Sequence, residues 1–424
     1  MPEDSRAALK MSRSQWTVVL LLTASVIINY VDRSNLSIAA TVVQRTLELS
    51  PLQIGSLLSA FFWSYALLQL CGLVGWLTDR FPVGWVMACG YAVWSIATII
   101  TGLMSSFTTM FLALLLLGVG ESVAYPCYSR MFAELPESQR GKANALIDAG
   151  TKLGPAAGAF VGGLLLVRIG WRMLFIALGA GGLLWLLPWL RAMPRGQSQS
   201  PAADRAEAAS FAKLLRLRCG WGAFIGHFCG NYFFYYLLTW LPIYLVREQK
   251  MSVGSMSRLT ASLFLLIATS TAITGWISDR FIARGVSVTR VRLTVVVGGM
   301  SVASSIAALA FVRHDPSLSL AVLAIASVGY GAFASTHWAI AQTLAGPGFA
   351  GRWSSLQNGV ANLSGIVAPW TAGLIVQLNG SSRLAFAVTG AVAFAGALDW
   401  LLMVRRVEPV QWEALQPKMA SRPA

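Results

Sequence analysis

Three ionisable residues interrupt apolar stretches of the sequence. Asp32 and Arg33 follow an apolar run that begins at Trp16, and Glu121 lies among glycines and apolar residues. In a membrane such a group costs several kcal/mol unless it is paired or faces a cavity, so it marks a functional site by default. A guanidinium suits a carboxylate or phosphate, and burial favours the protonated form of a carboxylate. We therefore expect anion binding at Arg33 and proton uptake at Asp32 and Glu121, the alternative being static pairs between helices.

A second group of charges lies further along the chain. Asp148 and Lys152 are four residues apart, so on a helix they share one face and can neutralise each other. Lys152 is also a candidate second cation for an anionic substrate. Asp399 has no evident partner, and we interpret it as a helix-packing or interface residue.

The histidines leave two interpretations open. His227 and His337 both have aromatic neighbours within apolar segments. Each can bind substrate or carry protons, or it can be a satisfied contact between helices. The sequence contains no HExxH, GxSxG or GxxxxGK[ST] pattern and no CxxC pair, so we expect no enzyme activity, no metal and no cofactor.

The composition identifies the elements that must position these residues. Of the 424 residues, 56% are hydrophobic and only 12% are charged, against about 25% charged in soluble domains. A water-soluble enzyme is therefore excluded, and at about 20 apolar residues per membrane helix we expect an all-α membrane protein with twelve transmembrane helices. The predicted spans are 16–43, 52–77, 84–105, 107–130, 141–167, 172–191, 219–246, 253–278, 291–312, 317–345, 352–378 and 382–404.

The charge distribution predicts the orientation. The net charge of +15 comes from basic residues that stand singly between apolar runs, which argues against nucleic acid. Most of them fall in the segments on the side of the N-terminus, so both termini are expected to be cytoplasmic. The predicted divisions are a tail at 1–15, a six-helix half at 16–191, a cytoplasmic linker at 192–218, a second half at 219–404 and a tail at 405–424. The run at Trp16 is expected to be a retained first helix.

A repeat supports the two halves. The heptapeptide Gly75–Phe81 recurs as Gly275–Phe281, each copy closing the second span of its half. Parallel six-helix halves are the architecture of major facilitator transporters, and the GxxxDR element resembles their inner-face loop motif. The resemblance implies gating roles for Asp79, Arg80, Asp279 and Arg280; the alternative is helix-end capping.

Further segments resemble one family within that superfamily, the anion/cation symporters. They are Asn29–Ala39, Ser59–Tyr65, Gly120–Pro126 and Leu238–Leu245. The family transports organic anions, including sugar acids, hexuronates and aromatic acids, with protons.

The resemblance implies roles for individual residues. Arg33 would contact the substrate carboxylate, while Asp32 and Glu121 would take up protons. The family's cavity is lined at the positions of Tyr30, Tyr65, Trp338 and Asn358.

The chain also departs from the sugar-acid members. It has no second arginine in Leu114–Leu117, and Lys152 stands at a position where some members carry glutamine. Together with Tyr235, the residues His227, His337 and Trp338 would give an aromatic, weakly polar wall suited to an aromatic acid or to a less hydroxylated carboxylate.

These observations predict a proton-coupled symporter of a small organic anion, working by alternating access; the alternative is an exporter or antiporter of an organic acid or drug-like metabolite. The expected partners are the anion, protons and the lipid bilayer, with no nucleic acid. A monomer in the inner (plasma) membrane is expected. The predicted substrate-binding residues are Arg33, Tyr30, Tyr65, Lys152, His227, Trp338 and Asn358.

Overall fold

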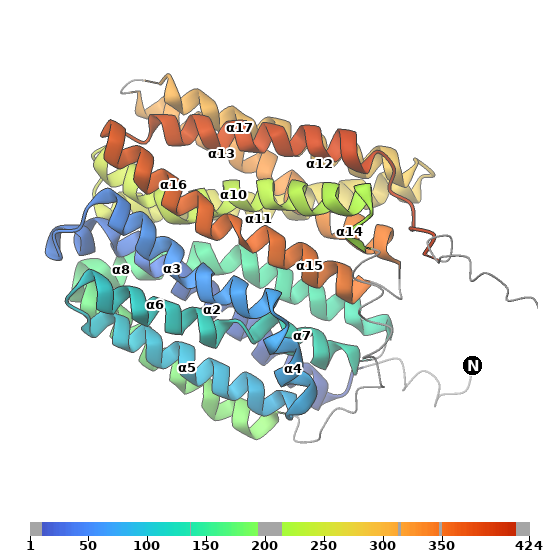
Figure 1. The fold of residues 1–424 in the computed structure, drawn as a ribbon, viewed down its shortest axis with the longest axis horizontal. Coiled ribbons are helices and arrows are strands. Elements are labelled where there is room, and N and C mark those ends of the chain that lie inside the picture. Colours follow the sequence, from blue (N-terminus) through green and yellow to red (C-terminus); the bar gives the residue numbers. More distant parts are fainter. Residues whose placement is uncertain (1–10, 136, 194–213, 313–314, 347–349, 413–424) are drawn as a thin grey trace, which may run out of the picture.

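The computed structural model describes residues 11–135, 137–193, 214–312, 315–346 and 350–412, and within these ranges it contains helices and no strand. The predicted linker at 192–218 and the two predicted tails lie largely outside the described residues. Figure 1 shows long helices lying side by side, with both ends of the described chain at the same end of the molecule. We call that end the terminal end and the opposite one the far end.

The first set of helices, coloured blue to green, occupies the lower half of Figure 1. Its members are α2 (Arg13–Thr46), α3 (Pro51–Leu70), α4 (Leu73–Arg80), α5 (Val83–Leu103), α6 (Phe107–Glu121), α7 (Ala124–Ala133) and α8 (Glu137–Ala192).

The second set, coloured yellow-green to red, lies above it. Its members are α10 (Arg218–Arg247), α11 (Val253–Ala283), α12 (Val288–Ala303), α13 (Pro316–Ala334), α14 (His337–Ala345), α15 (Ala350–Asn362), α16 (Ser364–Asn379) and α17 (Arg383–Asp399). A 3-10 segment, Ser304–Ala310, extends α12, and a π-helical turn, Trp400–Val404, extends α17.

The helices are long enough to cross a bilayer. Among the described residues, ten helical stretches have the length and hydropathy of membrane spans. The longest contains two spans, because α8 reverses at Gly170, whose φ of 75° is left-handed and suits glycine. The aromatic helix α10, 30 residues long, completes the twelve.

Polar residues fix where several helices begin. Ser12 and Gln15 form a capping box at α2, and Ser50 and Gln53 form another at α3. Each box satisfies two amide groups that have no partner within the helix. These caps set the ends of the two helices that carry or face Arg33.

Glycines bring α8 against α2. A Cβ added at Gly150, Gly154 or Gly158 would collide with Val26, Tyr30 or Ser34 respectively. Such small residues permit close approach of membrane helices. The contact positions Lys152 of α8 beside the helix that carries Arg33.

The two sets of helices approach most closely at the far end. A Cβ on Gly55 of α3 would lie 2.6 Å from the Pro369 carbonyl oxygen and 3.0 Å from Cα of Gly373 in α16. A Cβ on Gly163 of α8 would overlap Ser257 of α11. At the terminal end of α4, by contrast, a Cβ on Gly75 would have no atom within 4 Å. The far end is therefore the more tightly closed of the two.

Candidate functional site

Arg33 and Glu121 form a buried ion pair between α2 and α6. Arg33 Nε donates to Glu121 Oε2 at 2.9 Å, and the side chains are 3% and 0% exposed. Two charges withdrawn so far from solvent are stable only with close pairing. The two residues therefore form a pair between helices, the alternative that the sequence left open for them.

Aromatic rings surround the guanidinium. Its Cζ lies 4.9 Å from the ring centroid of Tyr30, 4.5 Å from Phe61 and 5.0 Å from Tyr65. These distances allow cation–π attraction. Sequence reasoning identified both tyrosines but not Phe61, although Phe61 lies one helical turn before Tyr65.

Part of the guanidinium remains available. Arg33 Nη2 is buried and has no hydrogen-bond partner among the described residues. An unpaired buried donor is costly, so a ligand that accepts from it gains affinity.

Asp32 points to a different neighbourhood from Arg33. Its Oδ1 accepts from Asn35 Nδ2 at 3.3 Å, and the indole of Trp94 lies beside it. A cavity of about 30 Å³ borders Asp32 and Arg33 and is otherwise lined mainly by leucine and phenylalanine side chains. That volume accommodates a water molecule or two, which gives the two charged residues a small polar space in apolar surroundings.

The expected pair of Asp148 and Lys152 is also formed. Lys152 Nζ donates to Asp148 Oδ1 at 2.9 Å and to the Thr151 hydroxyl at 2.9 Å. The Lys152 side chain is 12% exposed, whereas that of Asp148 is 45% exposed. The lysine therefore lies deeper than its partner.

The two histidines come together in the second set of helices. The rings of His227 and His337 lie 4.5 Å apart, and His227 lies 4.9 Å from Trp338. Gln357 Nε2 lies 3.3 Å from His227 Nδ1, and Gln357 Oε1 accepts from Trp353 Nε1 at 2.8 Å. Sequence reasoning missed Gln357, whose signal is its place four residues after Trp353 on the same helix.

A polar chain connects the two sets of helices. Tyr235 donates to Asn362 Oδ1 at 2.6 Å, and the Asn362 amide donates to Asn358. Asn358 Nδ2 in turn donates to Gln69 Oε1 on α3 at 3.4 Å. Asn358 thus lies at the boundary between the sets, bonded to Asn362 and Gln69, which the sequence did not single out.

The residues expected to gate do not pair with their chain neighbours. Asp79 accepts from Arg130 of α7 at 2.9 Å, and Arg280 lies over the ring of Trp276, 5.1 Å from Cζ to centroid. Asp279 interacts electrostatically with Arg292. The sequence did not predict roles for Arg130 or Arg292, because both partners come from other helices.

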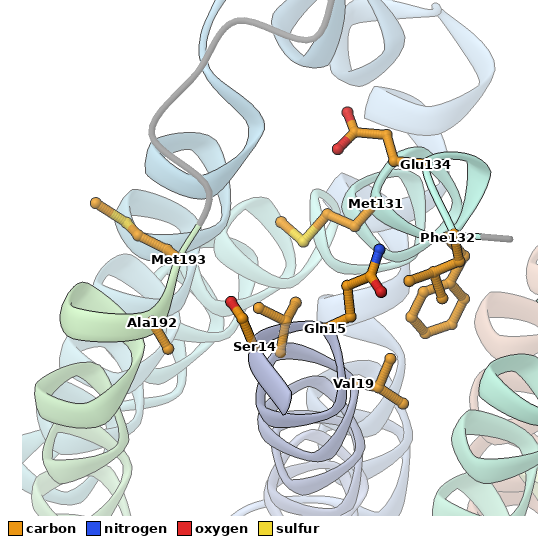
Figure 2. A pocket seen from close by; sticks show the side chains of 10 residues that line it. Ser14, Gln15, Val19, Met131, Phe132, Glu134, Ala192 and Met193 are labelled. Carbon is orange, nitrogen blue, oxygen red and sulfur yellow. The ribbon is translucent and has the colours of Figure 1, made fainter. Parts of the chain in front are cut away.

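A larger cavity, of about 230 Å³, lies at the terminal end of the first set. Figure 2 shows its side chains converging from the start of α2 (Ser14, Gln15), the end of α7 (Met131, Phe132) and the end of α8 (Met193). Its lining is mostly apolar, and none of the predicted site residues contributes to it. No group of three metal-ligating residues occurs in the described ranges.

Comparison with known proteins identifies relatives of this chain. The family model described as Major Facilitator Superfamily matches residues 22–369. The protein "Probable anion transporter 4, chloroplastic" of Oryza sativa subsp. japonica is 32% identical over 91% of this chain and 68% of its own. The "D-galactonate transporter" of Escherichia coli O6:H1 is 28% identical over 95% of this chain and 98% of its own.

A solved structure shares the fold. It is the crystal structure of a bacterial homologue of the human lysosomal transporter Spinster, with a TM-score of 0.77 at 20% identity, covering 94% of this chain and 98% of that one. The predicted fold class, an all-α membrane protein of twelve helices in two six-helix halves, is confirmed. The expectation that the chain is a transporter and no enzyme is also confirmed. Because the family model matches most of the chain and the fold is shared, this chain belongs to the major facilitator superfamily of membrane transporters.

Proposed function

We propose that the protein is a proton-coupled symporter of a small organic anion, a carboxylate such as a sugar acid or an aromatic acid. The observation that carries this proposal is the buried Arg33, which donates from Nε to Glu121 and whose Nη2 has no hydrogen-bond partner in the part of the chain that the structure describes. Relatives named for galactonate and for galactarate or glucarate support a carboxylate as the substrate.

The ion pair suggests how protons are coupled to the anion. When Glu121 is ionised it occupies Arg33 and competes with the substrate. When Glu121 takes up a proton its attraction for the guanidinium falls, and a carboxylate can take its place with two parallel hydrogen bonds. Release of that proton on the other side of the membrane restores the pair and expels the anion. Asp32, which is buried and immediately precedes Arg33 in the sequence, is the second proton site.

Other predicted residues would complete the binding site around Arg33. Tyr30 and Tyr65 surround the guanidinium from the first set of helices. His227, Trp338 and Asn358 approach from the second set. These side chains give the substrate an aromatic environment with a few polar contacts, and Lys152 supplies a second cation.

Transport would proceed by rocking of the two halves, 16–191 and 219–404, about this site. The far end, closed by Gly55 against Gly373, is then the outer gate, and the terminal end with Asp79 and Arg130 is the inner one. This assignment corresponds to a multi-pass monomer of the inner membrane whose two termini are cytoplasmic.

The test is uptake into liposomes that contain the purified protein. A panel of sugar acids, aromatic acids and dicarboxylates is supplied with and without an inward proton gradient. Uptake of one class that collapses when the gradient is dissipated supports symport. Arg33→Ala should abolish that uptake, whereas Arg45→Ala, an exposed arginine of the same helix, should leave it unchanged. Gradient-driven uptake that survives Arg33→Ala contradicts the proposal.

A further inference from the structure

Both intramembrane cations of the proposed cavity are held by carboxylates of the chain itself. Arg33 binds Glu121 and Lys152 binds Asp148, each at 2.9 Å. The two pairs differ in burial, since Glu121 is fully buried whereas 45% of the Asp148 side chain is exposed. A pair within one helix whose carboxylate is 45% exposed contributes less free energy than a fully buried pair, so an incoming anion displaces Asp148 from Lys152 at low cost.

The position of Lys152 places this second cation at the boundary between the helix sets. Its ammonium is close enough to His227 and His337, both in the second set, for direct electrostatic interaction. Asp148 interacts in the same way with Tyr330 of α13. Lys152 therefore lies within electrostatic range of the opposing half.

The hydrogen bonds of His227 orient a donor in this region. The Trp353 indole donates to Gln357 Oε1, so the Gln357 amide nitrogen faces His227 and donates to its Nδ1. A neutral imidazole that accepts at Nδ1 carries its proton on Nε2. The Nε2–H group lies on the ring edge away from Gln357, and the Asn231 side chain, four residues further along α10, also interacts with this ring.

A second buried polar atom completes the region. Within the described residues, the buried His337 Nδ1 forms no hydrogen bond of normal geometry, and the ring interacts with the carbonyl groups of Phe333 and Ala334. Buried polar atoms are usually satisfied, so an exception needs an explanation. Beside a lysine and a second imidazole, an acidic ligand supplies one.

We propose that Lys152 and the His227–His337 pair form a second anion-binding pole, so that the substrate is an organic acid with two anionic groups, and that Asp148 occupies this pole when the substrate is absent. The proposal rests on anion binding at Arg33 and deepens it by naming the substrate class. Tyr30 contacts Arg33 and interacts with Tyr330, which interacts with Asp148. The body of the substrate, between its two acid groups, would pack against these two rings.

The experiment compares acids that differ only in the second acid group. Galactonate and galactarate form one pair of probes, and benzoate and isophthalate form another. Affinities are measured by ligand-induced thermal stabilisation of the purified protein and by competition in liposome uptake. In at least one pair the diacid should bind at least about tenfold more tightly than the monoacid.

Four variants separate the second pole from the first. Lys152→Gln should lower the ratio of diacid to monoacid affinity about tenfold, and Lys152→Arg should restore most of it. Asp148→Asn removes the competing carboxylate and should tighten diacid binding. Lys142→Gln, which replaces an exposed lysine near the start of the same helix, should leave the ratio unchanged.

Two results overturn the second pole. One is monoacid binding that equals diacid binding in both pairs, and the other is a diacid to monoacid ratio that Lys152→Gln leaves intact. In either case monoacid binding that depends on Arg33 would still stand, so the proposed function survives. The proposed function would instead be overturned if the original protein bound none of the acids, or if Arg33→Ala left acid binding unaffected.

Discussion

At the scale of single residues, the Arg33–Glu121 pair has a structural role as well as its proposed role in transport. Each partner neutralises the other in a place where an isolated charge is strongly unfavourable. Neutralising Glu121 while keeping its shape therefore separates anion binding from proton coupling, because the variant resembles the protonated carboxyl group.

We expect Glu121→Gln to bind the anion and exchange it across the membrane but to lose uptake driven by a proton gradient. The glutamine no longer competes for Arg33, and it has no proton to release. Counterflow exchange and gradient-driven uptake, measured on the same liposomes, distinguish the two activities. Glu134→Gln, at an exposed position, is the control, and gradient-driven uptake by Glu121→Gln at the rate of the original protein would contradict the coupling role.

The hydroxyl of Tyr235 should contribute measurably to stability. Tyr235→Phe leaves Asn362 Oδ1 without its 2.6 Å hydrogen bond, and an unsatisfied buried acceptor costs about 1–3 kcal/mol. We expect a lower free energy of unfolding when the detergent-solubilised protein is denatured. Tyr91→Phe is the matched control, because the buried Tyr91 hydroxyl has no hydrogen-bond partner in the described part of the chain. Equal effects of the two variants would refute this account.

The sequence predicted several of these contacts and missed others for a simple reason. The pairing of Asp148 with Lys152 is local, so helical spacing was enough to foresee it. The partner of Asp79 was not local: adjacent residues on a helix point about 100° apart, and Asp79 binds Arg130 of α7 rather than its neighbour Arg80. Partners that come from other helices depend on packing that spacing does not encode.

At the scale of elements, the chain after α17 is held against the terminal end of the second set. Val407 N donates to Thr289 Oγ1 at 3.0 Å, and Val410 N donates to the Leu344 carbonyl at 2.9 Å. The Trp412 indole donates to the Ala345 carbonyl at 2.9 Å. This segment therefore joins the start of α12 to the end of α14.

Trp412→Ala should destabilise the protein by about 2 kcal/mol, because it removes a hydrogen bond and a partly buried aromatic side chain. Its ring also packs near Trp353, 6.4 Å between centroids, which in turn orients Gln357. Thermal unfolding of the purified variant measures the loss. Trp63→Ala, at an exposed ring on α3, removes the same side chain from the surface, and an equal change there would show that docking of Trp412 adds nothing.

Composition and hydropathy anticipated twelve spans because a bilayer demands long apolar helices whatever their packing. They did not anticipate the breaks within spans, such as the interruption at Gly72, where a φ of 73° separates α3 from α4. Nor did they anticipate that Val407 and Trp412, in the segment 405–424 predicted as a tail, form hydrogen bonds with the helices. These features depend on tertiary contacts and on single backbone angles.

At the scale of the whole molecule, the two sets of helices meet through small residues at the far end. Gly55 lies against Gly373, and Gly163 lies against Ser257. Backbones this close leave no passage between them. If transport requires the far ends to separate, a covalent bond across this contact must stop it.

A disulfide between α8 and α11 tests that requirement. Gly163→Cys and Ser257→Cys are introduced together after the five native cysteines have been replaced by serine. The contact is tighter than a disulfide needs, so oxidation should link the two helices after a small adjustment. Uptake should then fall to background and return on reduction, whereas the Ser257→Cys single variant should keep its uptake under both conditions. Because the bond restrains only the far ends and leaves Arg33 untouched, linked protein should still bind the anion in detergent. Linked protein that also transported at the original rate would show that the far ends need not part, and the rocking of two halves would have to be abandoned.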